Sequence, residues 1–208
     1  MGLRREFAAE AVAQHGRESD EVLMVRVAEG DTAAYEALYH RYKNRLLTFV
    51  ARYVGDRDAA EDLVQEVFLK LYRAPAAFDP RNRFMTWVFT VARNLAIDHL
   101  RRKKPATTLA QTTDEGEVRI EPEDRDTPAP ADAVLFEEME GRLSHVLMSL
   151  SDKLREVFVL CAMQGLSYEE VAQIVGCPAK TVSSRLARAR RRFLEELEPY
   201  LEGKRNRP

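Results

Sequence analysis

Apolar residues recur every three or four positions along most of this chain, which is the spacing of one face of an α-helix. No stretch of any length alternates between apolar and polar residues as a strand would. The periodic segments fall into two groups of four. Their approximate limits are residues 21–28, 31–54, 59–73 and 86–102, then residues 132–150, 152–164, 167–175 and 179–201. The pattern predicts an all-α protein made of two small helical domains.

Turn and capping residues support these limits. Asp31 is a suitable N-cap for the second helix, and Gly55 follows its last periodic residue. Either Asp56 or Asp58 caps the third helix. The prolines of residues 75–80 then interrupt the pattern before the fourth helix begins.

The two groups are separated by residues 106–130, which hold hardly a large apolar side chain. Acidic residues and prolines dominate this stretch, a composition typical of an extended and self-repelling linker. The chain is therefore divided into an N-terminal extension (1–19), a first domain (20–105), a flexible acidic linker (106–131), a second domain (132–202) and a frayed tail (203–208).

Composition narrows the class of protein. Hydrophobic residues make up 45% of the 208 positions, enough to build cores, and the net charge is only −2. The chain is not a polycation, so any binding of nucleic acid has to come from local basic patches. No apolar run approaches the roughly 20 residues of a membrane span, and the first 20 residues do not resemble a signal peptide. We expect a cytoplasmic protein without membrane insertion.

The two cysteines, Cys161 and Cys177, lie in no CxxC motif or Cys/His cluster, so a zinc site is not expected. A disulfide between them and two reduced thiols are the alternatives, and reduced thiols suit a cytoplasmic protein. The sequence contains no Ser/His/Asp set, metal-binding cluster or phosphate-binding loop. It therefore predicts neither an enzyme nor a cofactor.

Residues 166–192 carry the strongest functional pattern. Ser167 caps a short helix, and Ala172 is small where two helices would cross closely. Gly176 follows that helix, where the chain needs a left-handed residue, and Pro178 suits the first position of the next helix. Val182 then packs back against the first helix. These spacings are typical of a helix-turn-helix that places its second helix in the major groove of DNA.

The second helix of this motif has one apolar face and one basic face. Val182, Leu186, Ala189, Phe193 and Leu197 form the apolar face. The opposite face carries the residue types that contact phosphates and base edges. A basic helix face by itself is most often merely solvated, but next to the turn motif it indicates DNA binding. The candidate contacts are Lys180, Thr181, Ser183, Ser184, Arg185 and Arg188.

The helix at residues 59–72 has a continuous apolar face and an acidic face opposite it. The acidic face would ordinarily be solvated, but a large apolar residue, Leu69, stands in its middle. An acidic ridge with one apolar side chain suits docking to a basic partner helix. We assign this docking to Asp62, Gln65, Glu66 and Leu69.

The loop and helix at residues 78–104 combine aromatic, polar and basic side chains. Phe78 and Phe84 frame the loop, which can hold an unstacked base, and Trp87 follows on the helix. The alternative is that these three aromatic residues belong to the core. The basic end of the helix runs on to Lys104.

Three motifs together resemble the extracytoplasmic-function (ECF) family of RNA polymerase sigma factors. Residues 58–72 (DAAEDLVQEVFLKLY) are similar to region 2.2 of that family, and residues 84–101 (FMTWVFTVARNLAIDHLR) to regions 2.3 and 2.4. Residues 166–178 (LSYEEVAQIVGCP) and 181–190 (TVSSRLARAR) are similar to region 4.2. The resemblance covers both domains in the family's order, with the linker between them.

The resemblance implies a transcription initiation factor. Asp62, Gln65, Glu66 and Leu69 would dock on the coiled coil of the polymerase β′ subunit, and region 4 near the β flap. The six candidate contacts on the second helix of the helix-turn-helix would read the −35 element as double-stranded DNA. The −10 element would be read as single strand with a flipped base by Phe78, Asp79, Arg83, Phe84, Trp87, Asn94 and Arg101. The acidic linker would thread toward the RNA exit path.

Ser183 departs from the family, many members of which carry a basic residue there, so one −35 contact would be weaker or different. The resemblance also implies a cognate anti-sigma factor that covers the same surfaces. Two other functions stay open: a repressor that uses the second domain alone, and a sigma-like decoy that sequesters an anti-sigma factor. The motifs of the first domain argue against the repressor. Arg185 and Arg188 argue against the decoy.

Overall fold

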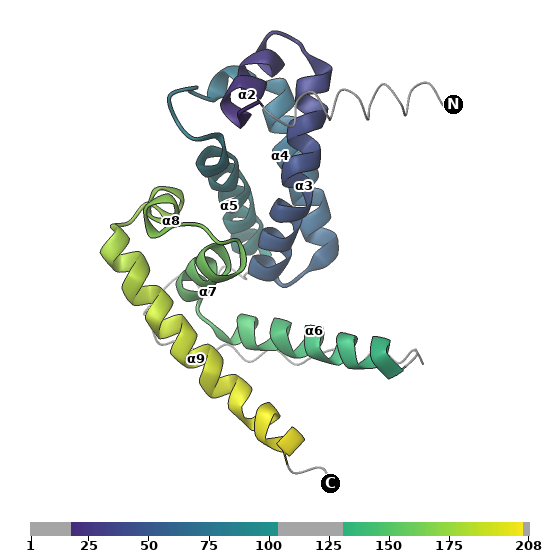
Figure 1. The fold of residues 1–208 in the computed structure, drawn as a ribbon, viewed down its shortest axis with the longest axis vertical. Helices are drawn as coiled ribbons and strands as arrows, with labels where there is room; N and C mark the ends of the chain where they lie inside the picture. Colours follow the sequence, from purple (N-terminus) through teal and green to yellow (C-terminus); the bar gives the residue numbers. More distant parts are fainter. Residues whose placement is uncertain (1–17, 104–130, 206–208) are drawn as a thin grey trace. The chain divides into compact units, whose positions relative to one another are not determined.

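The computed structural model describes residues 18–103 and 131–205, and every element in those ranges is helical (Figure 1). The chain divides into two compact units, and the main division between them falls after Lys103. The predicted all-α class with two helical domains is thus confirmed. The predicted linker lies outside the described residues.

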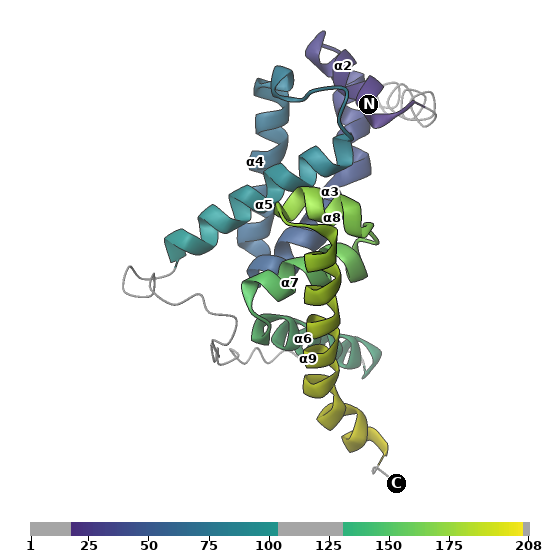
Figure 2. The same cartoon turned by 90° about the vertical axis from the view of Figure 1, so that its left-hand side faces the viewer.

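The first unit is built around two long helices, α3 (Thr32–Val54) and α4 (Arg57–Arg73), which pack side by side and are joined by a tight turn at Gly55. Helix α2 (Asp20–Ala28) crosses one end of α3, and α5 (Phe84–Lys103) packs on both long helices (Figure 2). A 3₁₀ turn, η1 (Pro75–Ala77), follows α4.

Apolar side chains from all four helices form the core of this unit. Helix α3 contributes Phe49 and α5 contributes Phe89, and their rings meet edge to face with centroids 5.6 Å apart. Both side chains are fully buried. The apolar face of α4 that the spacing predicts is buried throughout, at Ala60, Leu63, Val64, Val67, Phe68 and Leu71.

Side-chain caps explain where the helices of the first unit begin. Asp31 Oδ1 accepts the amide hydrogens of Ala33 and Ala34, at 2.9 and 3.2 Å, which confirms Asp31 as the N-cap of α3. Asp56 Oδ1 accepts from the Ala59 amide at 3.0 Å, so Asp56 caps α4 and Asp58 lies in its first turn. Gly55, with φ of 77°, ends α3 in the left-handed conformation.

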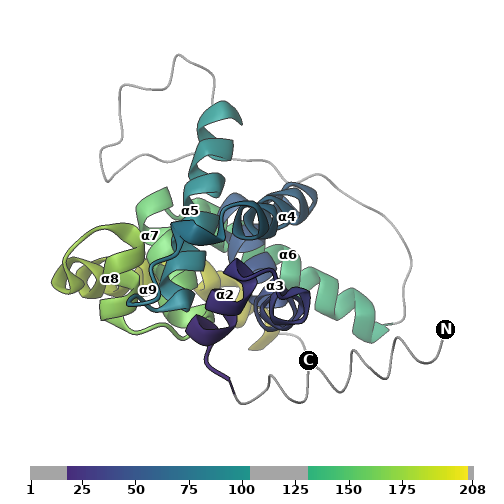
Figure 3. The same ribbon diagram turned by 90° about the horizontal axis from the view of Figure 1, so that it is seen from above.

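The second unit contains α6 (Ala131–Ser149), α7 (Asp152–Phe158), the π-helical turn η3 (Val159–Met163), α8 (Tyr168–Val175) and α9 (Ala179–Arg205) (Figure 3). Helix α7 packs against α9. Val146, Leu147, Val157 and Leu160 are fully buried in this unit.

Among the helix limits that differ from those that the sequence predicts, three are informative. The helix expected over residues 152–164 widens into a π turn after Phe158. Helix α5 begins at Phe84, two residues before the expected start, because a side chain from α2 caps it, as described below. Helix α9 continues to Arg205, so the tail expected to fray from Gly203 is helical for three further residues. One glycine costs a helix only about 1 kcal/mol, which does not end it.

Candidate nucleic-acid interfaces and docking ridge

A capping box starts the first helix of the helix-turn-helix. The Glu170 amide donates to Ser167 Oγ at 3.2 Å, and the Ser167 amide donates in return to Glu170 Oε2 at 2.9 Å. This reciprocal pair satisfies two amide hydrogens at the start of α8. The prediction that Ser167 caps α8 is confirmed. The sequence signal for the return bond is the glutamate three residues after the serine.

The turn between α8 and α9 is fixed by backbone geometry. Gly176 has φ of 71°, and the Cys177 amide donates to the Ala172 carbonyl at 3.1 Å. Helix α9 begins at Ala179, so Pro178 stands one residue before the helical position that the sequence predicts for it. The Pro178 carbonyl accepts from the amides of Thr181 and Val182, at 2.8 and 3.2 Å, and so starts the helix.

Helix α9 separates its apolar and polar faces as expected. Val182, Leu186 and Ala189 are at most 2% exposed, whereas Phe193 and Leu197 are half-buried. Phe193 stacks on Phe158 with ring centroids 4.8 Å apart. On the other side, Lys180, Ser183, Ser184 and Arg188 are exposed, and Thr181 and Arg185 are partly exposed. The structure thus brings the six predicted −35 residues onto one accessible surface.

Two of these six residues are held in place by contacts inside the motif. Ser184 Oγ donates to the Thr181 carbonyl at 3.0 Å, and Arg185 Nη1 lies 3.8 Å from Cys177 Sγ. The Arg185 guanidinium is therefore directed toward the turn of the helix-turn-helix.

The docking ridge consists of Asp62, Gln65, Glu66 and Leu69 on the outer face of α4. Asp62 and Gln65 are exposed, and Glu66 pairs with Lys70 at 3.5 Å. Leu69 is 42% exposed although its neighbour Phe68 is buried. The structure therefore places the four predicted residues on one accessible face.

Sequence reasoning missed Tyr72, which is 57% exposed and lies one helical turn beyond Leu69. Its ring meets that of Tyr35 edge to face, with centroids 5.4 Å apart. The sequence does contain a signal for Tyr72, since it stands three residues after Leu69 and therefore on the same face of the helix. Tyr72 extends the apolar part of the docking ridge toward the end of α4.

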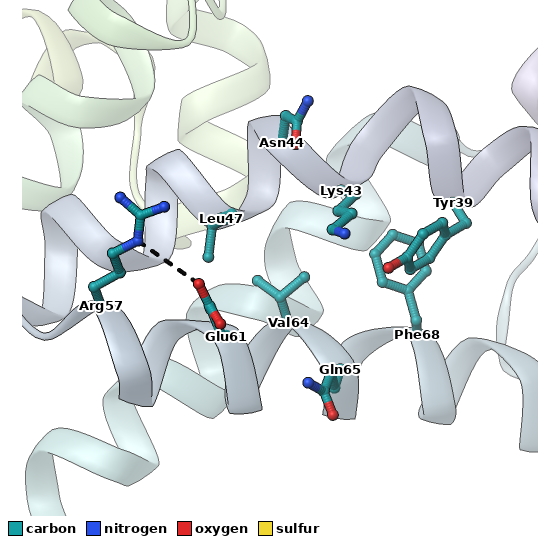
Figure 4. Close-up of a pocket in the computed structure, with 9 residues that line it drawn as sticks. All are labelled: Tyr39, Lys43, Asn44, Leu47, Arg57, Glu61, Val64, Gln65 and Phe68. Atoms are coloured by element: carbon teal, nitrogen blue, oxygen red, sulfur yellow. Dashed lines mark ion pairs between the residues drawn. The ribbon is translucent and has the colours of Figure 1, made fainter.

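A pocket of about 320 Å³ opens between α3 and α4 beside the ridge (Figure 4). Leu47, Val64 and Phe68 supply its apolar lining, and Gln65 joins it to the ridge. Arg57 and Glu61 at its edge are 3.6 Å apart and form an exposed ion pair. The remaining lining residues are Tyr39, Lys43 and Asn44.

Two of the three aromatic residues around the loop at 78–83, Phe78 and Phe84, belong to the core, the alternative that the sequence left open. Phe84 is fully buried and Phe78 is 5% exposed, whereas Trp87 is half-buried. Their three ring centroids are 5.5 to 5.9 Å apart. Phe78 and Phe84 therefore support the two ends of the loop and offer little open ring surface.

The loop itself folds into a tight turn. Asp79 accepts the backbone amide of Arg81 at 3.0 Å and pairs with its guanidinium at 2.6 Å, and the Asn82 amide donates to the Asp79 carbonyl at 2.9 Å. The side-chain hydrogen bond from Arg81 is the main reason that the pKa of Asp79 falls to about 2. Asp79 thus stays ionised and bound within the loop, and Arg83 follows it with an exposed side chain.

Three predicted −10 residues share one stripe of α5. Trp87, Asn94 and Arg101 are spaced seven residues apart, which is close to two helical turns. Trp87 is half-buried, and Asn94 and Arg101 are exposed. The stripe runs from the aromatic end of α5 to its basic end, about 21 Å along the helix axis.

Both cysteines are free thiols, so no disulfide joins Cys161 to Cys177. Burial raises the pKa of Cys161 to about 11, despite the nearby positive charge of Arg190, so its thiol is neutral at physiological pH. No cluster of metal-binding side chains occurs among the residues that the structure describes. Within those same ranges, no helix is long and apolar enough to cross a membrane.

The start of α2 makes contacts that the sequence did not reveal. Residues 18 and 19 belong to this structure rather than to an unassigned extension, because Ser19 caps α2 and Glu18 pairs with Arg26 at 2.8 Å. Glu21 Oε1 accepts the amide hydrogen of Phe84 at 3.0 Å. Periodicity carries no signal for such a contact, since its partners lie 63 residues apart.

Comparison with known proteins agrees with this arrangement. Residues 38–105 match the family described as Sigma-70 region 2, and residues 140–193 match Sigma-70, region 4. The ECF RNA polymerase sigma-E factor of Haemophilus influenzae is 34% identical over 187 residues, which cover 88% of this chain and 97% of the relative.

Two solved structures are also similar. The structure of CnrH in complex with the cytosolic domain of CnrY is 27% identical, with a TM-score of 0.65, and the match covers 88% of this chain and 99% of CnrH. The sigma factor RpoE of Bartonella quintana, solved with the anti-sigma factor NepR, is 27% identical with a TM-score of 0.58, over 79% of this chain and 96% of RpoE. The chain therefore belongs to the ECF family of RNA polymerase sigma factors, which are transcription initiation factors and not enzymes.

Proposed function

We propose that this chain recruits core RNA polymerase through the docking ridge of α4, which binds the coiled coil of the β′ subunit. The observation that carries this proposal is the exposure of Leu69 in the middle of an acidic helix face. The centre of a protein interface is formed by large apolar side chains of this kind. The flanking acids, Asp62 and Glu66, complement a basic partner helix.

Promoter recognition is divided between the two domains, residues 20–105 and 132–202. The exposed face of α9 binds the −35 element as duplex, with Lys180 and Thr181 suited to phosphates and Arg185 and Arg188 suited to base edges. Ser183 supplies only a short hydroxyl on this face.

The melted −10 strand follows the stripe of α5. Asn94 reads a base, Trp87 offers a partly open ring for stacking, and Arg83 and Arg101 contact phosphates at either end. Asp79, Phe78 and Phe84 hold the loop in shape instead of touching the strand.

The mechanism involves no covalent step. Holding both domains on polymerase at promoter spacing raises the effective concentration of each for its own element. Unstacking a base costs a few kcal/mol, and capture of the flipped base by the loop and α5 offsets part of this cost. The second domain docks near the β flap. The acidic linker, which lies outside the described residues, then follows the RNA exit path.

A cognate anti-sigma factor is the expected regulator. The solved RpoE from Bartonella quintana is in complex with the anti-sigma factor NepR. A regulator of this class would cover the docking ridge and the DNA-binding surfaces, so that the chain is released only on a signal. Because promoters and polymerase are intracellular in bacteria, the chain acts in the cytoplasm.

Run-off transcription with core polymerase on a genomic promoter library tests the proposal. The chain should yield discrete transcripts whose upstream sequences share a −35 and a −10 element. Arg188→Ala should reduce these transcripts, and polymerase without the chain should give none of them. A chain that protects promoter DNA without polymerase would instead be a repressor. A chain that binds an anti-sigma factor but supports no transcription would be a decoy.

A further inference from the structure

The first helical residue of α5 is capped by a side chain from another helix. The Phe84 amide donates to Glu21 Oε1 of α2 at 3.0 Å. Helix α5 has no acidic residue in its own first turn, and the residue before it, Arg83, has no side-chain acceptor. Glu21 therefore supplies both the hydrogen-bond acceptor and the negative charge that a helix N-terminus favours.

Helix α2 is itself anchored on α3. Arg41 Nη1 lies 2.5 Å from Asp20 Oδ1 and donates to the Glu18 carbonyl at 3.0 Å. The hydroxyl of Tyr42 donates to the other oxygen of Asp20, and the ring of Tyr42 meets the ring of Phe84 with centroids 5.1 Å apart. Helix α3 thus contacts both partners of the cap: it binds Asp20, the neighbour of Glu21, and packs against Phe84.

Both ends of the loop at 78–83 depend on this arrangement. Helix α2 packs against η1, which leads into the loop, and against α5, which follows it. Phe78 and Phe84 join the two ends with ring centroids 5.7 Å apart, and Trp87 packs on both. A shift of the Phe84 backbone would therefore move Trp87 and the whole loop.

We propose that Glu21 is a positioning residue for −10 recognition: by capping α5 from α2, it fixes the loop at 78–83 and the start of the Trp87–Asn94–Arg101 stripe. The inference rests on the proposed −10 function of that stripe. Recognition of a flipped base requires groups held to within about 0.5 Å, and helices hold groups more firmly than loops do. Glu21 never touches DNA and acts through the backbone of Phe84.

The cap is charged under ordinary conditions. Partial desolvation raises the pKa of Glu21, but the hydrogen bond from the Phe84 amide, its own backbone amide, Ser19 and the charge of Arg83 together lower it below its ordinary value of 4.5. A carboxylate with a lowered pKa stabilises the folded state at pH values above its ordinary pKa, and loses this effect as the pH falls through the lowered value. The cap is therefore fully formed at neutral pH and is lost only below pH 4.5.

The chain contains a single tryptophan, Trp87, so its fluorescence reports directly on this region. Glu21→Ala should increase acrylamide quenching of Trp87 about twofold, because an uncapped helix end frays and exposes the ring. Glu21→Gln keeps an acceptor oxygen without the charge and should lie between wild type and Glu21→Ala. Glu36→Ala, which removes an exposed glutamate from α3, is the matched control and should leave quenching unchanged.

The functional test uses holoenzyme and a promoter fragment recovered from the run-off library. Each base of its −10 element is changed in turn, and open-complex formation is measured on the duplex fragment. Glu21→Ala should reduce discrimination between the original and altered −10 bases about tenfold, which corresponds to the strength of a helix cap. Binding to core polymerase and to a −35 duplex should stay at the wild-type level.

Unchanged −10 discrimination in Glu21→Ala overturns the inference. So does an equal loss of polymerase binding and discrimination, since this would indicate a general loss of stability. Asn94→Ala separates the two proposals: if Asn94→Ala loses discrimination while Glu21→Ala keeps it, only the role of Glu21 fails. If neither variant loses it, the proposed −10 function of α5 fails as well. If Glu21→Ala does not fold, the same criteria apply to Glu21→Gln.

Discussion

At the scale of single residues, the leucines of α4 differ in burial although they are the same residue type. Leu63 and Leu71 lie in the core of the first unit, whereas Leu69 on the same helix is 42% exposed. Leu69→Glu should weaken binding to core polymerase at least about thirtyfold, as expected for the centre of an interface. The variant should melt within a few degrees of wild type. Co-purification with core polymerase and thermal unfolding measure the two effects.

The matched control is Val22→Glu on α2, where the wild-type valine is 48% exposed and lies outside the docking ridge. It places the same charge on another exposed apolar position of the same domain. Polymerase binding should persist in this control. Normal co-purification of Leu69→Glu would contradict the assignment of the ridge.

Among the proposed −35 residues, Arg188 is the one whose loss should matter most, because it is exposed on the outer face of α9. Arg188→Ala should weaken binding of the holoenzyme to a −35 duplex by about 1–3 kcal/mol, the usual size of an arginine contact to a base. Arg192→Ala, one turn further along and also exposed, should cost less and show no base preference. Equal effects of the two variants on every −35 sequence would indicate phosphate contact alone.

Residue by residue, the sequence predicts a site best where periodicity decides exposure. The buried face of α4, the exposed Leu69 and the polar face of α9 all follow from helical spacing. The burial of Phe78 and Phe84 does not, since a loop has no period that separates an inward ring from an outward one. The cap from Glu21 to Phe84 also has no local signal. Only the folded chain brings these two residues together.

At the scale of the helical elements, two glycines with different backbones provide a matched test. Gly176 has φ of 71° in the turn of the helix-turn-helix, whereas Gly141 lies inside α6, and a methyl group added at either meets nothing within 4 Å. Gly176→Ala should destabilise the second domain by about 1–2 kcal/mol, the cost of a left-handed alanine. Gly141→Ala should stabilise it by about 0.5–1 kcal/mol through helix propensity. Urea unfolding followed by circular dichroism distinguishes the two signs.

The cap of α4 gives a prediction that depends on pH. The hydrogen bond from the Ala59 amide is the main reason that the pKa of Asp56 is lowered below 3.8. Asp56 therefore contributes stability at pH values above 3.8, and this contribution is lost as the pH falls through the lowered pKa. At pH 7, Asp56→Ala should cost about 1 kcal/mol. Near pH 2 the difference from wild type should shrink, and urea unfolding at the two pH values measures it.

The π turn shows what periodicity misses at this scale. The Gln164 amide donates to the Val159 carbonyl at 3.0 Å, five residues earlier instead of the four of an α-helical bond. The apolar residues around Cys161 fit an α-helix equally well in sequence. The π turn has no composition signature.

At the scale of the whole molecule, charge limits what the chain does alone. The net charge is −2, and acids concentrate between the two domains. The free chain should therefore leave a promoter fragment unprotected at physiological salt, and protection should appear once core polymerase is added. Replacing Asp114, Glu115, Glu117 and Glu121 by their amides should strengthen binding of the free chain to DNA, most clearly at low salt. No change in affinity at any salt concentration would contradict this electrostatic account.

The Glu21–Phe84 contact has a consequence for how the first domain is made. Glu21 and Phe84 are 63 residues apart in the sequence, so bringing them together costs conformational entropy. The packing of α3 on α4, which lie between them, offsets part of this cost. During synthesis, α2 leaves the ribosome well before Phe84 does. The strand-reading surface that we propose is therefore completed only after α5 has been synthesised and has packed on α3 and α4.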